Sequence, residues 1–209
     1  MDPSYFDSRY TPHPDRKKVW QAICEYLQKY VAPASTVMDV GAGYCDFINQ
    51  IQARTKVAVD INPQTARWCA PDVRFVQATP IEAIALPNNS VDVIMASNLL
   101  EHLTPTQCSA LFDRFDDLLT TGGKLIVIQP NYSYCYRRYW DDFTHVRAFS
   151  DISLTDLLHS RGYRMLAVEK RFLPFGFKSR VPKSYWMTKL YLASFWRPLA
   201  AQMLIVGQR

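Results

Sequence analysis

Short apolar runs alternate with amphipathic segments along most of the chain. Five runs rich in β-branched residues have the length and composition of buried strands, at 36–40, 56–60, 73–77, 91–96 and 124–128. Two further strands are predicted at 163–168 and 203–207. Alternation of strands with helical segments is typical of a parallel sheet, so we expect an α/β, doubly wound, mostly parallel sheet of seven strands.

Amphipathic spacing predicts the helices between these strands. A leading helix is expected over 14–31, where Val19, Ile23 and Leu27 share one face. Shorter helices are expected over 46–53 and 63–70. Thr104 and Pro105 start a longer helix that Gly122–Gly123 is expected to close, and another runs from Ser150 to Gly162.

Composition limits the class of protein. With 209 residues, 48% of them hydrophobic, the chain suits one domain over 1–209. Its five cysteines form no CxxC pair and have no histidine at metal-ligand spacing, so we expect reduced thiols and no metal site. The charged, proline-containing start lacks the apolar run of a signal peptide, and no stretch approaches a membrane span. We therefore expect a cytoplasmic protein.

The first strand runs directly into a glycine turn, Gly41-Ala-Gly43-Tyr-Cys45. Glycines let backbone approach a ligand closely, and N–H groups at such a turn suit an anionic or zwitterionic group. Asp60 ends the second strand about twenty residues later, where a carboxylate can accept both hydroxyls of a ribose. Together these features predict a ligand that contains adenosine.

The same turn argues against a dinucleotide. The G-x-G-x-x-G fingerprint requires a third glycine at the position that Asp46 occupies, and a carboxylate there would repel a pyrophosphate. An NAD-dependent sugar-modifying enzyme therefore stays only as an alternative.

Four segments carry a resemblance to a known family: VMDVGAGYCDF at 37–47, VAVDINP at 57–63, SVDVIMASNLLEHL at 90–103 and LLTTGGKLIVIQPNY at 118–132. Together they resemble the class I S-adenosylmethionine-dependent methyltransferases, which have a Rossmann-like fold. The chain is most similar to the small bacterial type 11-like group, which is often linked to cell-surface glycan or lipid-linked sugar synthesis. The resemblance implies S-adenosylmethionine as the cofactor.

The resemblance also implies roles for individual residues in cofactor binding. Gly41, Ala42 and Gly43 would line the methionine end, and Asp39 would anchor its ammonium group. Asp60 would hold the ribose. The remaining implied contacts are Ile61, Ala78 and Thr79 around the adenine, and Ser97 and Asn98 beside the methionine.

Two positions depart from the family pattern. Cys45 replaces the usual third glycine, and Thr79 replaces the acid that often bonds the adenine amine. We expect a weaker hold on the cofactor, and these departures leave open a non-catalytic S-adenosylmethionine-binding subunit.

A polar aromatic segment at 131–147 follows the fifth strand and is predicted to be a loop that meets the methyl acceptor. Aromatic faces suit sugar rings and guanidinium groups suit phosphates or carboxylates. The candidate contacts are Tyr132, Tyr134, Arg137, Arg138, Trp140 and Arg147. The alternative is that these aromatic side chains only pack on the core.

Methylation of a hydroxyl requires removal of its proton. His145 is the candidate general base because imidazole titrates near neutral pH, and Asp141 or Asp142 would orient or replace it. Glu101 and His102 resemble the family's EH pair. They are secondary catalytic candidates, and the alternative is that they only position their loop beneath the cofactor.

The last part of the chain is basic, with eight basic and no acidic residues from Lys170 onward. An insertion at 172–200 separates the last two strands and includes a predicted helix at 183–196. It would act as a lid or contact an anionic membrane at its inner face.

Nucleic-acid methylation is disfavoured because no NPPY-like tetrad is present. The favoured function is O-methylation of a sugar or other small polar acceptor, free or lipid-linked.

Overall fold

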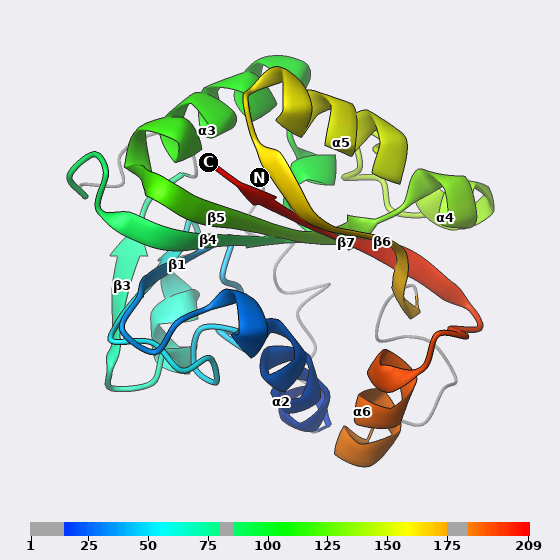
Figure 1. Ribbon diagram of the computed structural model, residues 1–209, viewed down its shortest axis with the longest axis horizontal. Helices are drawn as coiled ribbons and strands as arrows, with labels where there is room; N and C mark the ends of the chain where they lie inside the picture. The colour runs from blue at the N-terminus through cyan, green and yellow to red at the C-terminus, as the bar shows by residue number, and fades with distance from the viewer. Residues whose placement is uncertain (1–14, 80–85, 175–183) are drawn as a thin grey trace.

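A computed structural model describes residues 15–79, 86–174 and 184–209. Its centre is a seven-stranded sheet in the order β3-β2-β1-β4-β5-β7-β6 (Figure 1). Only β7 runs antiparallel to its neighbours. The predicted doubly wound, mostly parallel sheet is therefore confirmed. The strands are β1 Thr36–Val40, β2 Thr55–Asp60, β3 Val73–Gln77, β4 Val91–Ser97, β5 Leu119–Pro130, β6 Arg164–Pro174 and β7 Ala200–Gln208.

Helices cover both faces of the sheet (Figure 1). On one face lie α3 Pro105–Leu118, α4 Tyr132–Tyr139 and α5 Asp151–Ser160; on the other lie α2 Arg16–Leu27, which continues as η1 Gln28–Tyr30, and α6 Tyr185–Ala193. Each face has its own hydrophobic cluster, because side chains alternate across a strand. Val40 and Val59 pack toward α3, whereas Val37 and Ala58 pack toward α2.

The prediction of a helix at 46–53 is wrong, because turns occupy this segment. Isolated helical bonds form, such as Asn49 N–H to the Cys45 carbonyl at 3.0 Å, but they do not continue. The Asn49 side chain instead bonds the carbonyl of Trp68 and the N–H of Ala70. An amide that bonds the backbone of another segment competes with helix formation. The segment predicted as a helix at 63–70 is the 3₁₀ helix η2 Pro63–Trp68.

Two other expectations need correction. Gly122 and Gly123 do not end a helix: α3 stops at Leu118, and both glycines lie within β5. A Cβ on Gly123 would lie 2.8 Å from the Thr120 carbonyl oxygen, so the pair permits a tight entry into the strand. The segment at 131–147 is not entirely a loop, because Asn131 caps the helix α4 by accepting the N–H of Ser133.

The insertion before β7 contributes α6, which is shorter than the predicted helix and packs beside α2 (Figure 1). Residues 175–183, which include Lys178, Arg180 and Lys183, lie outside the described residues. Gln202, at the start of β7, donates to the Asn98 side chain at 2.9 Å, so the chain returns beside the carboxyl end of β4. Among the described residues, no helix is long and apolar enough to cross a membrane.

Candidate active site

The glycine turn after β1 folds over the end of β2. The N–H groups of Gly41 and Ala42 both bond the Val59 carbonyl, at 2.9 and 3.2 Å. Gly41 has φ 73°, and a Cβ there would lie 3.2 Å from Cδ1 of Leu99. The positive φ favours glycine at this position, and the side chain of Leu99 leaves little room for a Cβ.

Asp60 fixes the second half of this turn. Its buried carboxylate accepts the N–H of Gly43 and the N–H of Asn62, each at 2.8 Å. Burial raises the pKa of Asp60, and these backbone donors oppose the rise. The Ala78 N–H bonds the Asp60 carbonyl at 3.1 Å, so Thr79 begins the loop beside it, while Ile61 is 39% exposed at the rim. The residues expected around ribose and adenine therefore lie together.

Asp39 is the carboxylate at the centre of the site whose ionisation is energetically unfavourable. It is buried, and its pKa is raised to about 8, mainly by burial and then by the charges of Asp60 and Asp46; the N–H of Ile48 opposes the rise. An ionised carboxylate in such a place requires a positive partner. The ammonium group of S-adenosylmethionine has that charge, so this site fits the expected cofactor.

Asp46, at the position where dinucleotide-binding proteins have glycine, pairs with Arg16 of α2. The guanidinium Nη2 lies 2.6 Å from the carboxylate. Arg16 thereby partly neutralises the carboxylate of Asp46, which was expected to repel a pyrophosphate. Asp46 nevertheless occupies the position where that fingerprint requires glycine for close packing of the helix on the strand.

Cys45 has a φ of 57°, in the left-handed region that favours glycine. Its thiol is buried, and its sulfur lies 3.3 Å from that of Cys69. No disulfide joins these two cysteines in the structure. A small side chain therefore fits this turn in the left-handed conformation.

Ser97 ends β4 and Asn98 follows it, on the opposite side of the turn from Asp60. Asn98 also has a positive φ, 49°, and its N–H bonds the Ile128 carbonyl at 2.8 Å. Its side-chain amide donates to the Ser97 hydroxyl at 3.2 Å and accepts from Gln202. This network fixes the orientation of the loop in which Leu99 covers Gly41.

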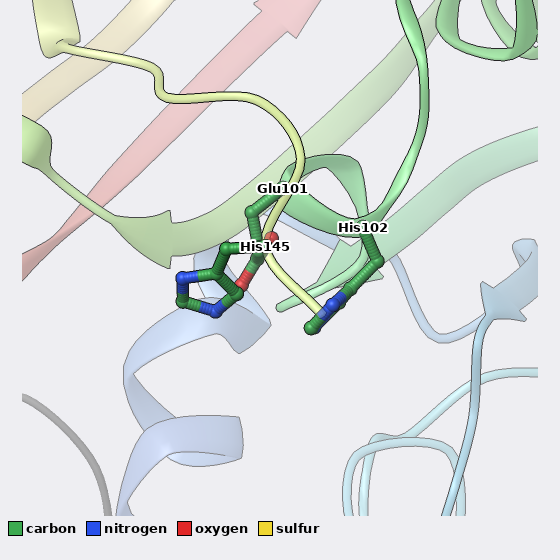
Figure 2. A group of neighbouring side chains, drawn as sticks. All are labelled: Glu101, His102 and His145. Atoms are coloured by element: carbon green, nitrogen blue, oxygen red, sulfur yellow. The ribbon is translucent and has the colours of Figure 1, made fainter. Parts of the chain in front are cut away.

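The next turn of chain, η3 Leu100–His102, brings three catalytic candidates together. Glu101 and His102 project from this turn, and His145 comes from the segment after α4 (Figure 2). One ligand atom from each of the three side chains lies within 4.8 Å of the others. Glu101 is 1% exposed, and burial raises its pKa to about 8. The EH pair and the distant histidine thus form a single polar cluster.

Backbone hydrogen bonds hold this cluster together across the sequence. The N–H groups of Val146 and Arg147 both bond the Glu101 carbonyl, at 2.9 and 3.2 Å. The His145 Nδ1 lies 2.7 Å from the Tyr139 carbonyl oxygen. Tyr139 was not predicted as a site residue, although it lies within the aromatic segment at 131–147.

Asp142 is linked to both histidines, and its backbone carbonyl accepts the N–H of His145 at 3.1 Å. Its Oδ1 accepts the Thr144 hydroxyl at 2.7 Å, and that hydroxyl lies 3.0 Å from His102 Nδ1. Asp142 therefore orients His102 through Thr144, a residue that the sequence analysis did not select. Asp141 pairs with Arg138 at the surface, 3.3 Å away.

Aromatic side chains form a wall beside the cluster. Tyr139 contacts His145, Trp140 and Tyr132, with ring centroids 4.5, 5.1 and 5.2 Å away. Tyr139 is fully buried, whereas Trp140 is 53% exposed. Trp140 and Tyr132 are therefore the members of the wall that can offer a surface to a ligand.

Four other predicted acceptor contacts have partners elsewhere. Arg137 lies against the Tyr136 ring and Arg147 against the Phe149 ring. Arg138 is bound to Asp141, and Tyr134 lies under the guanidinium of Arg171 at 4.4 Å. Acceptor binding by these four residues stays a prediction.

The family of the chain follows from comparison with known proteins. A family model described as a methyltransferase domain matches residues 13–168. The chain belongs to this methyltransferase family. The match includes the glycine turn, Asp60 and the polar cluster, so the enzyme assignment is confirmed. No curated protein matches the sequence.

Solved structures confirm the fold of this methyltransferase. A SAM-dependent methyltransferase from Archaeoglobus fulgidus is 19% identical, with all of both chains covered and a TM-score of 0.71. The 1,6-didemethyltoxoflavin-N1-methyltransferase of Burkholderia thailandensis, solved with S-adenosylhomocysteine, is 20% identical over 99% of this chain and 84% of its own, with a TM-score of 0.62. An S-adenosylmethionine-dependent methyltransferase from Mesorhizobium loti is 14% identical, covering 90% and 98%, with a TM-score of 0.65. Family and fold together support S-adenosylmethionine as the cofactor.

Proposed function

We propose that this methyltransferase uses S-adenosylmethionine to methylate a hydroxyl of a sugar or another small polar acceptor. The observation that carries the proposal is the position of the polar cluster Glu101, His102 and His145. Glu101 lies two residues after Leu99, whose side chain covers the glycine turn. His145 contacts Tyr139 in the aromatic wall. A cofactor site and a polar, aromatic-lined site thus share the loop after β4.

Bound S-adenosylmethionine supplies a methyl group that its cationic sulfur activates, so the protein contributes chiefly by positioning. Asp39 holds the ammonium group of the cofactor and Asp60 its ribose. The side chain of Leu99 packs beside Gly41, where a Cβ would be only 3.2 Å away. These residues fix the position of the cofactor relative to the loop that carries Glu101.

The acceptor binds on the other side of that loop. The exposed face of Trp140 and the ring of Tyr132 suit the apolar face of a sugar, and the buried cluster receives its hydroxyl. Because Glu101 and His145 lie inside this cluster, it is where the hydroxyl loses its proton. His145 is the member that can take the proton directly.

An acceptor screen tests this proposal. The protein would be incubated with S-adenosylmethionine and a panel of sugars, sugar nucleotides and lipid-linked sugars, with S-adenosylhomocysteine and methylated product measured by mass spectrometry. We expect product from at least one carbohydrate. With a water-soluble acceptor, we expect a lower rate in Trp140→Ala than in the control Trp186→Ala, which alters an exposed tryptophan on α6. Methylation of amines alone would contradict the proposal. Binding of S-adenosylhomocysteine without any product would favour the non-catalytic subunit.

A surface around α6 is proposed as the site of peripheral membrane contact. Trp186, Leu190 and Trp196 are each about 70% exposed there, and Phe195 is fully exposed. Lys189 pairs with Glu25 and Arg197 with Glu169, so these two cations are partly neutralised. Contact with an anionic membrane would therefore depend mainly on the apolar side chains, next to a site that accepts a lipid-linked sugar.

A further inference from the structure

We propose that Glu101, His102 and His145 bind one divalent transition-metal ion. One imidazole or carboxylate atom from each residue lies within 4.8 Å of the other two, a span that small side-chain rotations close around a single ion (Figure 2). Two imidazoles and one carboxylate suit Mn²⁺, Fe²⁺, Co²⁺ or Zn²⁺ better than Mg²⁺ or Ca²⁺, which prefer oxygen ligands.

The orientation of both imidazoles supports this proposal. His145 Nδ1 lies 2.7 Å from the Tyr139 carbonyl oxygen, and His102 Nδ1 lies 3.2 Å from the Thr144 carbonyl oxygen. A carbonyl can only accept, so a ring that bonds it donates from Nδ1, and in the neutral form of that ring the lone pair lies on Nε2. Metal-binding histidines are typically fixed in this way, by a hydrogen bond from the second ring nitrogen to a backbone carbonyl or carboxylate.

The carboxylate of Glu101 is the second, independent indication. Glu101 is 1% exposed, and its Oε2 is buried without a hydrogen-bond partner in the structure. A buried carboxylate oxygen without a donor is costly, and native proteins rarely retain one. A cation held between Glu101 and the two histidines would satisfy that oxygen and compensate its charge.

Two further contacts hold the three ligands in place. The Asp142 carboxylate bonds the Thr144 hydroxyl, which contacts His102 Nδ1, so it supports one ligand indirectly. The N–H groups of Val146 and Arg147 bond the Glu101 carbonyl and fix the distance between η3 and the segment that carries His145. The positions of all three ligands are therefore set by neighbours rather than by the ion alone.

A role for the ion in the reaction rests on the proposed function. Three protein ligands leave coordination positions open, and an acceptor hydroxyl bound there would have a lower pKa and lose its proton to water. His145 would then act as a metal ligand instead of taking the proton itself. Binding of the ion, in contrast, requires only the three side chains.

Metal binding is measured first, without any reaction. Protein treated with a chelator and then freed of it would be titrated with Mn²⁺ and with Zn²⁺ by calorimetry, and with Co²⁺ by visible absorption. We expect one ion per chain, with affinity at least about tenfold weaker in His145→Ala and in Glu101→Gln. The matched control is His159→Ala, in the last turn of α5 and outside the cluster, which should bind as the wild type does.

Binding of S-adenosylhomocysteine by each variant serves as the test of folding. Equal metal affinity in the wild type, His145→Ala and Glu101→Gln would overturn the proposal, as would no binding by a wild type that still binds S-adenosylhomocysteine. One bound ion, lost in both variants that retain S-adenosylhomocysteine binding, would support it. The proposed function fails separately, if metal-loaded protein transfers no methyl group to any hydroxyl acceptor.

Discussion

The carboxylate of Asp60 accepts the backbone N–H of Gly43 at 2.8 Å, across 17 residues of sequence. This bond joins the end of β2 to the glycine turn after β1, so the residue expected to hold the ribose also shapes the turn. Cofactor affinity and the conformation of the turn are therefore coupled through one side chain.

Asp60→Ala should weaken binding of S-adenosylhomocysteine by at least about 30-fold, because it removes charge-assisted hydrogen bonds to the ligand and the support of Gly43. Calorimetric titration measures this loss. Asp72→Ala is the control, since Asp72 is an exposed acid that pairs with Lys56 away from the turn. Similar affinities in the two variants would show that Asp60 does not hold the cofactor.

Asp39→Asn should stabilise the protein without ligand. The pKa of Asp39 is raised from 3.8 to about 8, so the wild type loses stability as the pH rises from about 4 to about 8. At pH 8 the variant should be more stable by about 2 kcal/mol or more, which raises Tm by about 4 °C or more. Below pH 4 the two proteins should converge, because the carboxyl is then neutral in the folded and unfolded states. Equal stability of the wild type and the variant at pH 8 would show that ionised Asp39 does not destabilise the ligand-free protein.

The same substitution should weaken the cofactor site. Wild-type affinity for S-adenosylhomocysteine should rise as Asp39 ionises toward pH 8, because only the carboxylate attracts the ligand's ammonium group. The ligand amine also titrates in this range, so Asp39→Asn is the reference that isolates the protein's contribution. We expect about tenfold weaker binding by the variant at pH 7.5 and a flatter dependence on pH. Parallel pH profiles would exclude a direct role for Asp39.

Cys45 should tolerate glycine but not a β-branched residue. Its φ of 57° lies in the left-handed region, where glycine has no steric cost and valine is a strong outlier. Cys45→Gly should change the free energy of unfolding by less than about 1 kcal/mol, and Cys45→Val should lower it by about 2 kcal/mol or more. Chemical denaturation measures both. Cys108→Val, which makes the same change at a buried helical position, should cost less than Cys45→Val.

The surface around α6 should bind vesicles through its apolar side chains. We expect the protein to float with liposomes that contain anionic lipid, and a Trp186→Ser/Leu190→Ser double variant to remain in solution. Ile152→Ser is the control, since Ile152 is a comparably exposed apolar residue on α5, across the sheet. Failure to float on neutral and on anionic vesicles would exclude membrane contact.

The central strands could be predicted because their apolar runs suit strands that are buried on both faces, as β1, β2 and β4 are. The edge strands β3 and β6 are mostly exposed or half-buried. Helices were less predictable where side chains bond elsewhere: Asn49 ties its segment to Ala70, and Asn131 starts α4 with a cap rather than an apolar stripe. Spacing from the glycine turn predicted Asp60, which ends β2, whereas the role of Asp39 was predicted only from the family resemblance.

The polar cluster could be predicted only as separate residues. Glu101 and His102 lie far from His145 in sequence, and backbone bonds from Val146 and Arg147 to the Glu101 carbonyl bring them together. Motif spacing carries no signal for such a contact. For the same reason, neither the contact of Thr144 with His102 nor the partners of Arg137 and Arg138 could be predicted.

The most direct test of the central claim is calorimetric titration of the protein with S-adenosylmethionine, S-adenosylhomocysteine and NADH. The structure and family predict that the first two bind at one site per chain and that NADH does not bind. Binding of NADH alone would contradict the account, because the glycine turn, Asp39 and Asp60 would then serve a dinucleotide despite Asp46.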